Sequence, residues 1–201
     1  MCGIIGLYLK KPELADEIGA LFAEMLICMT GRGPDSAGFA LYGNEPPQGY
    51  LKVTLRHDGD GCDWDGLAAQ LGARFGCEPR LEINANYAVI AVRADADELG
   101  AALSGLDSEL MVMSIGRSIE ILKEIGSPES IVDRFAIRGM RGSHIIGHTR
   151  MATESAVTTD GSHPFSTGMD LCLVHNGSLS NHNRLRNKLE RQGIEIRTEN
   201  D

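Results

Sequence analysis

The chain begins MCGIIGLY (residues 1–8), a short apolar stretch with a cysteine at position two. Cys2 directly follows Met1, and a small residue at position two usually allows the initiator methionine to be removed. Removal would leave one residue with both a thiol and a free α-amino group. Because an α-amino group has an ordinary pKa of about 7.7–8.0, it is partly unprotonated at neutral pH and can accept a thiol proton. The pattern predicts a cysteine that attacks a carbonyl carbon and forms a thioester.

Cys2 taken alone has a second interpretation. A cysteine within a short apolar run also suits a small buried residue on a first strand. Residues elsewhere in the chain must therefore decide between a nucleophile and a structural residue.

The composition of the 201 residues is that of an ordinary globular domain, with 42% hydrophobic and 23% charged residues. This length favours one domain with a substantial core. The net charge of −9 argues against a duplex nucleic-acid surface, which requires clustered Lys and Arg. The apolar run over 3–9 is too short for a signal peptide, and no stretch reaches the roughly 18–20 apolar residues of a membrane helix. We expect a cytoplasmic protein without nucleic-acid or membrane partners.

The cysteines and histidines indicate neither disulfides nor a metal site. The five cysteines include no CxxC pair, and an odd number does not suit a disulfide framework. The spacings of the later histidines match no common ligand pattern, which favours hydrogen bonding in loops and at strand ends. These histidines are His144, His148, His163, His175 and His182. We expect reduced thiols, no metal and no cofactor.

Hydrophobic periodicity and turn residues predict an alternation of strands and helices. Strands are expected over 3–9, 37–43, 50–56, 86–92, 110–116 and 171–177, with short strands and loops from 142 and a further strand in the final residues from 194. Helices are expected over 12–29, 63–75, 95–104, 117–125, 128–137 and 181–192. The turn-rich string GNEPPQG, residues 43–49, predicts a hairpin between the second and third strands.

Four further strings carry chemistry. They are RGPDSAG (32–38), GHTRMAT (147–153), HNGSLSNH (175–182) and TEND (198–201). Together with Cys2, and in this order, they resemble the class II glutamine amidotransferases, whose glutaminase domain belongs to the N-terminal nucleophile hydrolases. The resemblance covers residues 1–43 and 142–201 and leaves the middle of the chain uncovered. Five strings in order make a much more specific signal than any one of them.

The resemblance implies a role for each residue that matches a motif. Hydrolysis of the glutamine side-chain amide requires a nucleophile, donors for the oxyanion, and charges that hold the amino-acid end of the substrate. The implied nucleophile is Cys2, and the implied oxyanion donors are Asn176 and Gly177. The implied substrate-binding residues are Arg150 for the carboxylate, Thr153 beside it, and Asp201 for the ammonium. Arg32 and Asp35 are expected to brace the loop near Cys2 rather than to touch the substrate.

Each of these residues also has a structural interpretation. Asn176 and Gly177 suit a type I′ hairpin turn. Arg150 suits a surface salt bridge, and a carboxylate at a chain terminus such as Asp201 is ordinarily solvated. Their occurrence in one ordered set favours the functional interpretation.

The fold implied by the resemblance is α+β, a four-layer αββα sandwich of the N-terminal nucleophile hydrolase type. Residues 1–201 are expected to form the front part of a type 2 glutamine amidotransferase domain, with a family-atypical α/β insertion at about 57–140. The sandwich needs more strands after the TEND string, so we expect a longer polypeptide in which the C-terminal part of the fold follows.

The implied function is a glutaminase that supplies ammonia to a separate synthase subunit. Sugar-phosphate amidotransferases commonly have a histidine where this chain has Glu154. The insertion, together with MATES (151–155) and GSHPFS (161–166), is more similar to the amidotransferase subunits of split glutamate-synthase-like enzymes, including the N-methylglutamate synthase type.

Two other functions are compatible with the sequence. One is a non-catalytic docking or regulatory subunit that keeps the amidotransferase fold. The other is an acylase-like amidase of the same nucleophile group. The opposite charges of Arg150 and Asp201 disfavour the acylase, because such a pair suits a free amino acid better than an acyl chain.

Overall fold

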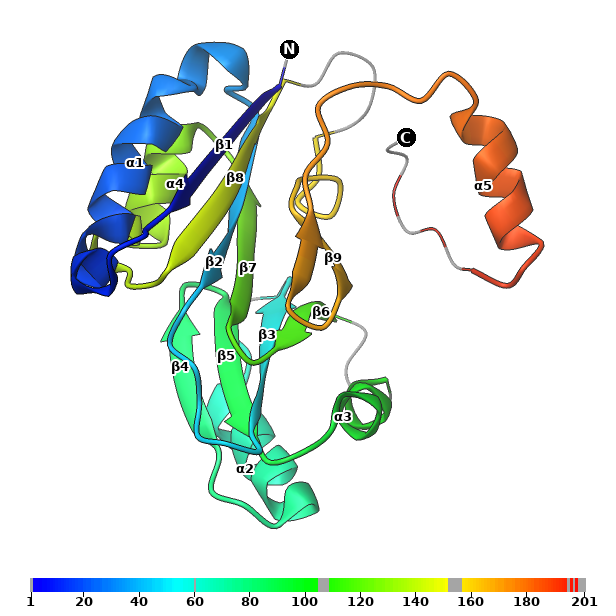
Figure 1. The fold of residues 1–201 in the computed structure, drawn as a ribbon. Helices are drawn as coiled ribbons and strands as arrows, with labels where there is room; N and C mark the ends of the chain where they lie inside the picture. Colours follow the sequence, from blue (N-terminus) through cyan, green and yellow to red (C-terminus); the bar gives the residue numbers. More distant parts are fainter. Residues whose placement is uncertain are drawn as a thin grey trace.

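The computed structural model describes residues 2–59, 61–104, 109–151, 157–194, 196 and 198. The strands in this part of the chain form three antiparallel sheets, and helices flank them, so the fold is α+β as the sequence predicts (Figure 1). None of the helices described combines the length and the apolar character that a membrane-spanning segment requires.

The first sheet joins strands that are far apart in the sequence. Its order is β1-β8-β2-β7, and every neighbouring pair is antiparallel. The strands are β1 (Gly3–Tyr8), β2 (Ser36–Tyr42), β7 (Ile119–Ile125) and β8 (His144–Arg150). Because β8 lies between β1 and β2, the start of the chain is held beside residues from its last third.

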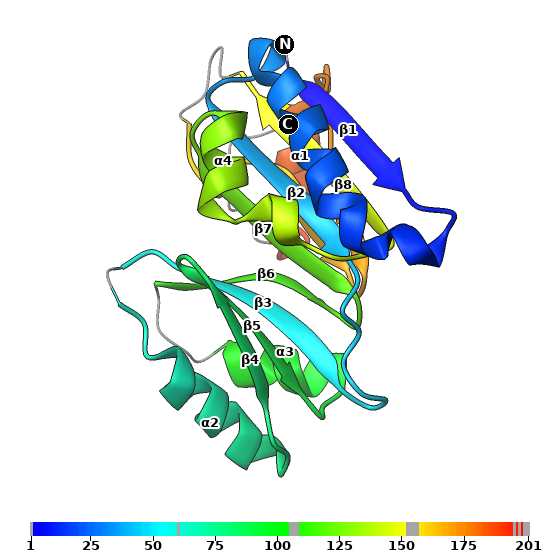
Figure 2. The same ribbon diagram turned by 90° about the vertical axis from the view of Figure 1, so that its left-hand side faces the viewer.

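Helices cover one face of this sheet (Figure 2). They are the 3-10 helix η1 (Pro12–Glu17), α1 (Ile18–Cys28), the 3-10 helix η2 (Thr30–Arg32), α4 (Pro128–Arg134) and the 3-10 helix η3 (Ile137–Gly139). Phe22 of α1 and Phe135 next to α4 pack against Phe39 of β2, and all three side chains are fully buried. The helix expected over 12–29 is confirmed, except that its first six residues, 12–17, are 3-10.

The second sheet has the order β4-β5-β3-β6 and its own apolar core. Its strands are β3 (Leu51–His57), β4 (Arg80–Asn84), β5 (Tyr87–Val92) and β6 (Leu110–Gly116). Helices α2 (Trp64–Phe75) and α3 (Ala96–Leu103) pack on one face and bury Leu71 and Leu99 against it. Each helix begins at an aspartate whose side chain accepts a hydrogen bond from a main-chain N–H of the first turn, which is a favourable N-cap.

The expected hairpin between the second and third strands is wrong. β2 pairs with β7 and β8 in the first sheet, whereas β3 pairs with β5 and β6 in the second. Both edges of β2 are therefore occupied by later strands, and the loop over 43–50 carries the chain from one sheet to the other. Neighbouring strands in the sequence form a hairpin only when no later strand competes for the same edge.

The expected helix over 117–125 is also wrong, because IEILKEI forms strand β7. Its apolar residues are spaced as a helix could have them, but Ile119, Ile121 and Ile125 are β-branched and alternate along the strand. Two charged residues within β7 are buried. Glu120 is paired with Lys52 of β3 at 2.5 Å, and Lys123 donates to main-chain carbonyl groups. These partners from distant parts of the chain offset the free-energy cost of burying the two charged groups in a strand.

The C-terminal part begins on the other face of the first sheet (Figure 1). It consists of β9 (Phe165–Gly168), β10 (Leu171–Leu173) and helix α5 (His182–Glu190). The strand expected over 171–177 ends at Leu173, and β4 and β9 were not predicted. Of the expected final strand, residues 194, 196 and 198 are described and none of them is in a strand.

Asp170 connects this part to the first two sheets. Its carboxylate accepts hydrogen bonds from the main-chain N–H groups of Arg117, Ser118 and Ile119 at 2.8–3.0 Å. These residues form the turn between β6 and β7. Burial alone would raise the pKa of Asp170, but the hydrogen bonds outweigh it and the pKa is lowered. The turn therefore holds the ionised carboxylate.

Replacement of Asp170 by Asn is expected to lower the free energy of unfolding by about 1–2 kcal/mol, since the amide accepts fewer bonds and the site is partly solvated. Because folding lowers the pKa of Asp170, its stabilising contribution is present above about pH 4 and is lost as the pH falls below that value. Urea unfolding at pH 7 and at pH 3.5 measures both effects. The matched control is Asp97→Asn on the exposed side of α3. Equal stability of the two variants at pH 7 would contradict this assignment.

Candidate active site

Three strand ends meet at one edge of the first sheet. Gly3 pairs with Thr149, and Ser36 pairs with Arg150, so β1 and β2 begin where β8 ends. Cys2 immediately precedes β1 and is half-buried. The antiparallel register therefore brings together the leading cysteine, the RGPDSAG string and the GHTRMAT string.

The RGPDSAG loop packs directly on the end of β8. A Cβ atom at Gly33 would lie 2.5–2.7 Å from main-chain atoms of Thr149 and Arg150, so only glycine fits. The main-chain N–H of Asp35 donates to the carbonyl of Arg150 at 3.1 Å, and the Asp35 carbonyl accepts from Gly126 N–H at 2.9 Å. The side chain of Arg32 is exposed.

The HNG string reaches the same edge from β10. The side-chain amide of Asn176 donates through Nδ2 to the main-chain oxygen of Cys2 at 2.9 Å. Neither Asn176 nor Gly177 has the positive φ that a type I′ turn requires, and the chain continues to α5 rather than returning as a hairpin. The hairpin-turn interpretation of these two residues is therefore wrong.

A pair of histidines, His148 buried and His163 half-buried, supports the segment that carries Asn176. His148 Nε2 donates to the carbonyl of His175 at 2.9 Å, and the rings of His148 and His163 lie 4.5 Å apart. Burial lowers the pKa of His148 to about 4 and that of His163 to about 3. Both imidazoles are thus neutral at pH 7, and His148 is the tautomer with hydrogen on Nε2.

Arg150, the last residue of β8, binds the loop over 158–164 through its side chain. Its side chain is buried, and one guanidinium nitrogen donates to the carbonyl of Gly161 at 3.2 Å. Gly161 belongs to the loop over 158–164, which leads into β9. The surface salt bridge considered for Arg150 is wrong, because burial excludes a surface position.

The structure thus brings together Cys2, Asn176 and Arg150, with the Arg32 and Asp35 loop behind them. Thr153, Glu154 and Asp201 lie outside the described residues. All five cysteines are free thiols, as expected. In the described ranges, no group of three or more His, Cys, Asp or Glu is arranged to hold a metal ion.

Sequence reasoning missed the roles of His148, His163 and Lys123 at this edge. His148 lies in the GHTRMAT string and His163 in GSHPFS, but neither string shows what these side chains contact. Gly38 of β2 pairs with His148 on one side and with Lys123 on the other, so His148 and Lys123 lie in one row across the sheet. That row becomes visible only when the strand order is known.

Comparison with known proteins decides the family. No protein-family model matches the chain. The whole chain is 50% identical to a glutamine amidotransferase-like protein, GlxB, of Rhizobium meliloti, of which it covers 66%. It is 33% identical to a putative glutamine amidotransferase of Methanothermobacter thermautotrophicus, of which it covers 69%. The chain belongs to the class II glutamine amidotransferase family.

Other members of this family match over a shorter range. A glutamine–fructose-6-phosphate aminotransferase of Acidithiobacillus ferridurans is 35% identical over 106 residues, which are 52% of this chain and 16% of that protein. The chain spans about two thirds of the length of the first two amidotransferase relatives. The resemblance inferred from the motifs is therefore confirmed at the level of the family.

Replacement of His148 by Phe is expected to lower the free energy of unfolding at pH 7 by about 1–3 kcal/mol, because the half-buried carbonyl of His175 loses its donor. It should also change the pH dependence. Folding lowers the pKa of both imidazoles, so the unfolded chain binds more protons than the native one between about pH 4 and 6.5. Stability of the wild type therefore decreases as the pH falls through that range.

Urea unfolding at pH 7, 6 and 5 measures this dependence. The His148→Phe variant should lose stability less steeply than the wild type as the pH falls. His182→Phe replaces a half-buried histidine at the start of α5, away from the His148–His163 pair, and serves as the control. An identical slope for wild type and His148→Phe would show that His148 is not buried in its neutral form.

Proposed function

We propose that this protein is a glutaminase of the N-terminal nucleophile type, which hydrolyses the side-chain amide of glutamine to glutamate and ammonia through a thioester on Cys2. The observation that carries the proposal is the 2.9 Å hydrogen bond from Asn176 Nδ2 to the main-chain oxygen of Cys2. It joins two motifs separated by most of the chain, and both are needed for amide hydrolysis. The names of the amidotransferase relatives support the same substrate.

The chemistry follows from the two functional groups of Cys2 once Met1 is removed. The α-amino group accepts the thiol proton while Sγ bonds to the amide carbon, and the same proton passes to the departing nitrogen as ammonia leaves. Water then attacks the thioester, releases glutamate and returns the proton to sulfur. Each proton is accounted for without a cofactor, and we propose none.

The oxyanion that forms in both steps requires hydrogen-bond donors. We propose the side-chain amide of Asn176 and the main-chain N–H of Gly177 for this role. The position of Asn176 Nδ2 beside Cys2 supports it. The neutral His148, which donates to the carbonyl preceding Asn176, keeps this segment in place.

The amino-acid end of glutamine requires charges of both signs. We propose Arg150 for its carboxylate, since a guanidinium group offers paired donors to a carboxylate. By the family resemblance, Thr153 assists Arg150 and Asp201 binds the ammonium group. Arg32 and Asp35 brace the loop behind Cys2, a role that the main-chain bond between Asp35 and Arg150 supports.

We propose the four-layer αββα sandwich as the complete architecture. The order of the layers supports it, since helices cover one face of the first sheet and β9 and β10 lie on the other. We propose that the second sheet with α2 and α3, residues 51–116, is the insertion. The sequence placed this insertion at about 57–140, and we propose the limits of the second sheet instead. Residues 119–125 pair with β2 and belong to the first sheet.

We propose a cytoplasmic enzyme that passes ammonia to a separate synthase subunit, as in split glutamate-synthase-like and N-methylglutamate synthase enzymes. Five free cysteines suit a reducing compartment. The motif set accounts for the release of ammonia and not for its use, so the proposal assigns its use to a partner subunit.

Covalent labelling tests the proposal. A glutamine analogue with an electrophilic side chain should modify Cys2 alone, and an excess of glutamine should slow the reaction. Peptide mass mapping locates the label, and an assay of ammonia release follows turnover. Cys2→Ser should abolish labelling and lower ammonia release at least about a hundredfold, because a hydroxyl is a much weaker nucleophile than a thiolate.

Cys172→Ser is the matched control, since it removes another half-buried thiol, on β10, that contacts the hydroxyl of Tyr42. It should label and turn over glutamine as the wild type does. A correctly processed protein that neither labels at Cys2 nor releases ammonia would contradict the proposal and favour a docking subunit. Equal turnover of glutamine and simple amides would favour an acylase-like amidase.

A further inference from the structure

Lys123 is a buried cation that the proposed reaction does not use. Its residue is only 3% exposed, and it lies on β7 in the same row of the sheet as Gly38 and His148. Its Nζ donates to the carbonyl of Ser162 at 2.6 Å and to that of Asp160 at 3.1 Å. It also lies 4.3 Å from the centre of the Phe165 ring. All three contacts belong to the segment over 158–165.

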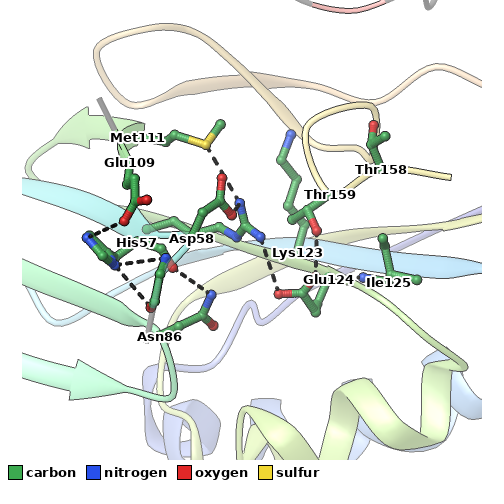
Figure 3. A network of polar contacts seen from close by, with 12 residues as sticks. His57, Asp58, Asn86, Glu109, Met111, Lys123, Glu124, Ile125, Thr158 and Thr159 are labelled. Atoms are coloured by element: carbon green, nitrogen blue, oxygen red, sulfur yellow. Dashed lines mark hydrogen bonds and ion pairs between the residues drawn. The ribbon is translucent and has the colours of Figure 1, made fainter. Parts of the chain in front are cut away.

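The same segment is held to the first sheet at other points. Thr159 Oγ1 donates to Glu124 at 2.5 Å beside Lys123, as Figure 3 shows. Ser162 Oγ donates to Ser36 Oγ at 2.8 Å, and Arg150 donates to the carbonyl of Gly161. The loop therefore lies on the sheet between Lys123 and Arg150, with alternate carbonyl groups bonded to each cation.

Gly38 allows this close approach. A Cβ atom there would overlap the carbonyl oxygen of His163 and the Cβ of Lys123. The loop thus lies directly on β2, and His163 is pressed against His148. Displacement of the loop would therefore change the site in two ways. It would move Arg150, and it would move His148, which bonds to the carbonyl of the residue before Asn176.

An apolar side chain would fill the position of Lys123 without the large free-energy penalty of burying an ammonium group. It would leave the carbonyls of Asp160 and Ser162 without these donors, and it would not fix the orientation of the loop on the sheet. Charge-assisted hydrogen bonds to main-chain oxygens do fix that orientation. The placement of this cation is therefore best explained by the position that it imposes on the loop.

We infer that Lys123 is a positioning residue of the glutamine site, whose ammonium group fixes the loop over 158–165 so that Arg150 and the His148–His163 pair keep their places. This inference rests on the proposed glutaminase function. Lys123 acts through the loop and does not touch the substrate. The loop bonds to Arg150 directly but reaches Asn176 only through the two histidines. Since the carboxylate of glutamine stays bound throughout the reaction, loss of this support affects mainly KM and much less kcat.

The charge on Lys123 gives the inference a pH signature. Burial lowers the pKa of Lys123 to about 8, with Asp160 opposing this effect and Arg56 adding to it. The other titratable groups against it are His163 on the loop and the hydroxyl of Tyr87, which is bonded to the main chain of Lys123. Above about pH 8 the ammonium group is neutral and its bonds to the two carbonyls are weaker. KM for glutamine should therefore rise as the pH increases through this value.

Two variants of Lys123 test the inference by steady-state kinetics between pH 6.5 and 9.5. Lys123→Met removes the donors and should raise KM at pH 7 by about tenfold or more, while kcat changes less than about threefold. Lys123→Arg keeps donors and charge over the whole range. It should keep KM within about threefold of the wild type at pH 7 and should lack the alkaline rise.

The control is the double variant Lys52→Met, Glu120→Gln. It removes the other buried lysine, which also donates to two main-chain carbonyls, without leaving an unpaired charge. This variant should keep KM and its pH dependence. Hydrogen exchange of the main-chain amides over 158–165 should be faster in Lys123→Met than in the wild type or the control.

The outcomes separate the inference from the proposed function. A wild-type protein without glutaminase activity overturns the proposed function. An active wild type overturns the inference alone if folded Lys123→Met keeps its KM, or if the control raises KM as much. If Lys123→Met does not fold, Lys123→Arg decides the matter. Its retention of the wild-type alkaline rise in KM would overturn the inference.

Discussion

The position of β8 between β1 and β2 is the constraint on which the rest of the structure depends. Antiparallel pairing fixes Gly3 opposite Thr149 and Ser36 opposite Arg150. A register shift of one residue would turn every side chain of a strand to the opposite face. His148 and Arg150 would then point into the helix-covered core instead of toward the loop and the HNG segment. One pairing thus brings Cys2, the RGPDSAG loop and Asn176 to a common edge.

The second sheet is joined to the first at the outer edge of β7. Lys52 of β3 bonds to Glu120, and the hydroxyl of Tyr87 bonds to both the N–H and the carbonyl of Lys123. An unpaired strand edge exposes backbone groups that favour aggregation. Side chains of the second sheet satisfy part of this edge in place of a fifth strand. The second sheet therefore also fixes the strand that carries Lys123.

The sequence predicted the parts of the fold that depend on local pattern. Strand β1 and helices α1 to α3 follow from hydrophobic periodicity and turn residues, and the α+β class follows from the family resemblance. The motif order also predicted that Cys2 and Asn176 belong to one site, and the structure places them in contact. The hairpin and the strand β7 could not be predicted, because both depend on which distant strand occupies each edge of β2. For the same reason, the roles of His148 and Lys123 follow only from the strand register: the GHTRMAT string contains His148 but does not show what it contacts, and no motif contains Lys123.

A glutamyl adduct on Cys2 is the most direct test of the account. The protein is mixed with isotope-labelled glutamine, quenched in acid within one turnover, and mapped by peptide mass. The account predicts a labelled thioester on Cys2 that forms about 10²–10³ times more slowly in Asn176→Ala, because one oxyanion donor is lost. An adduct on another cysteine, or an equal rate of formation in Asn176→Ala, would contradict it.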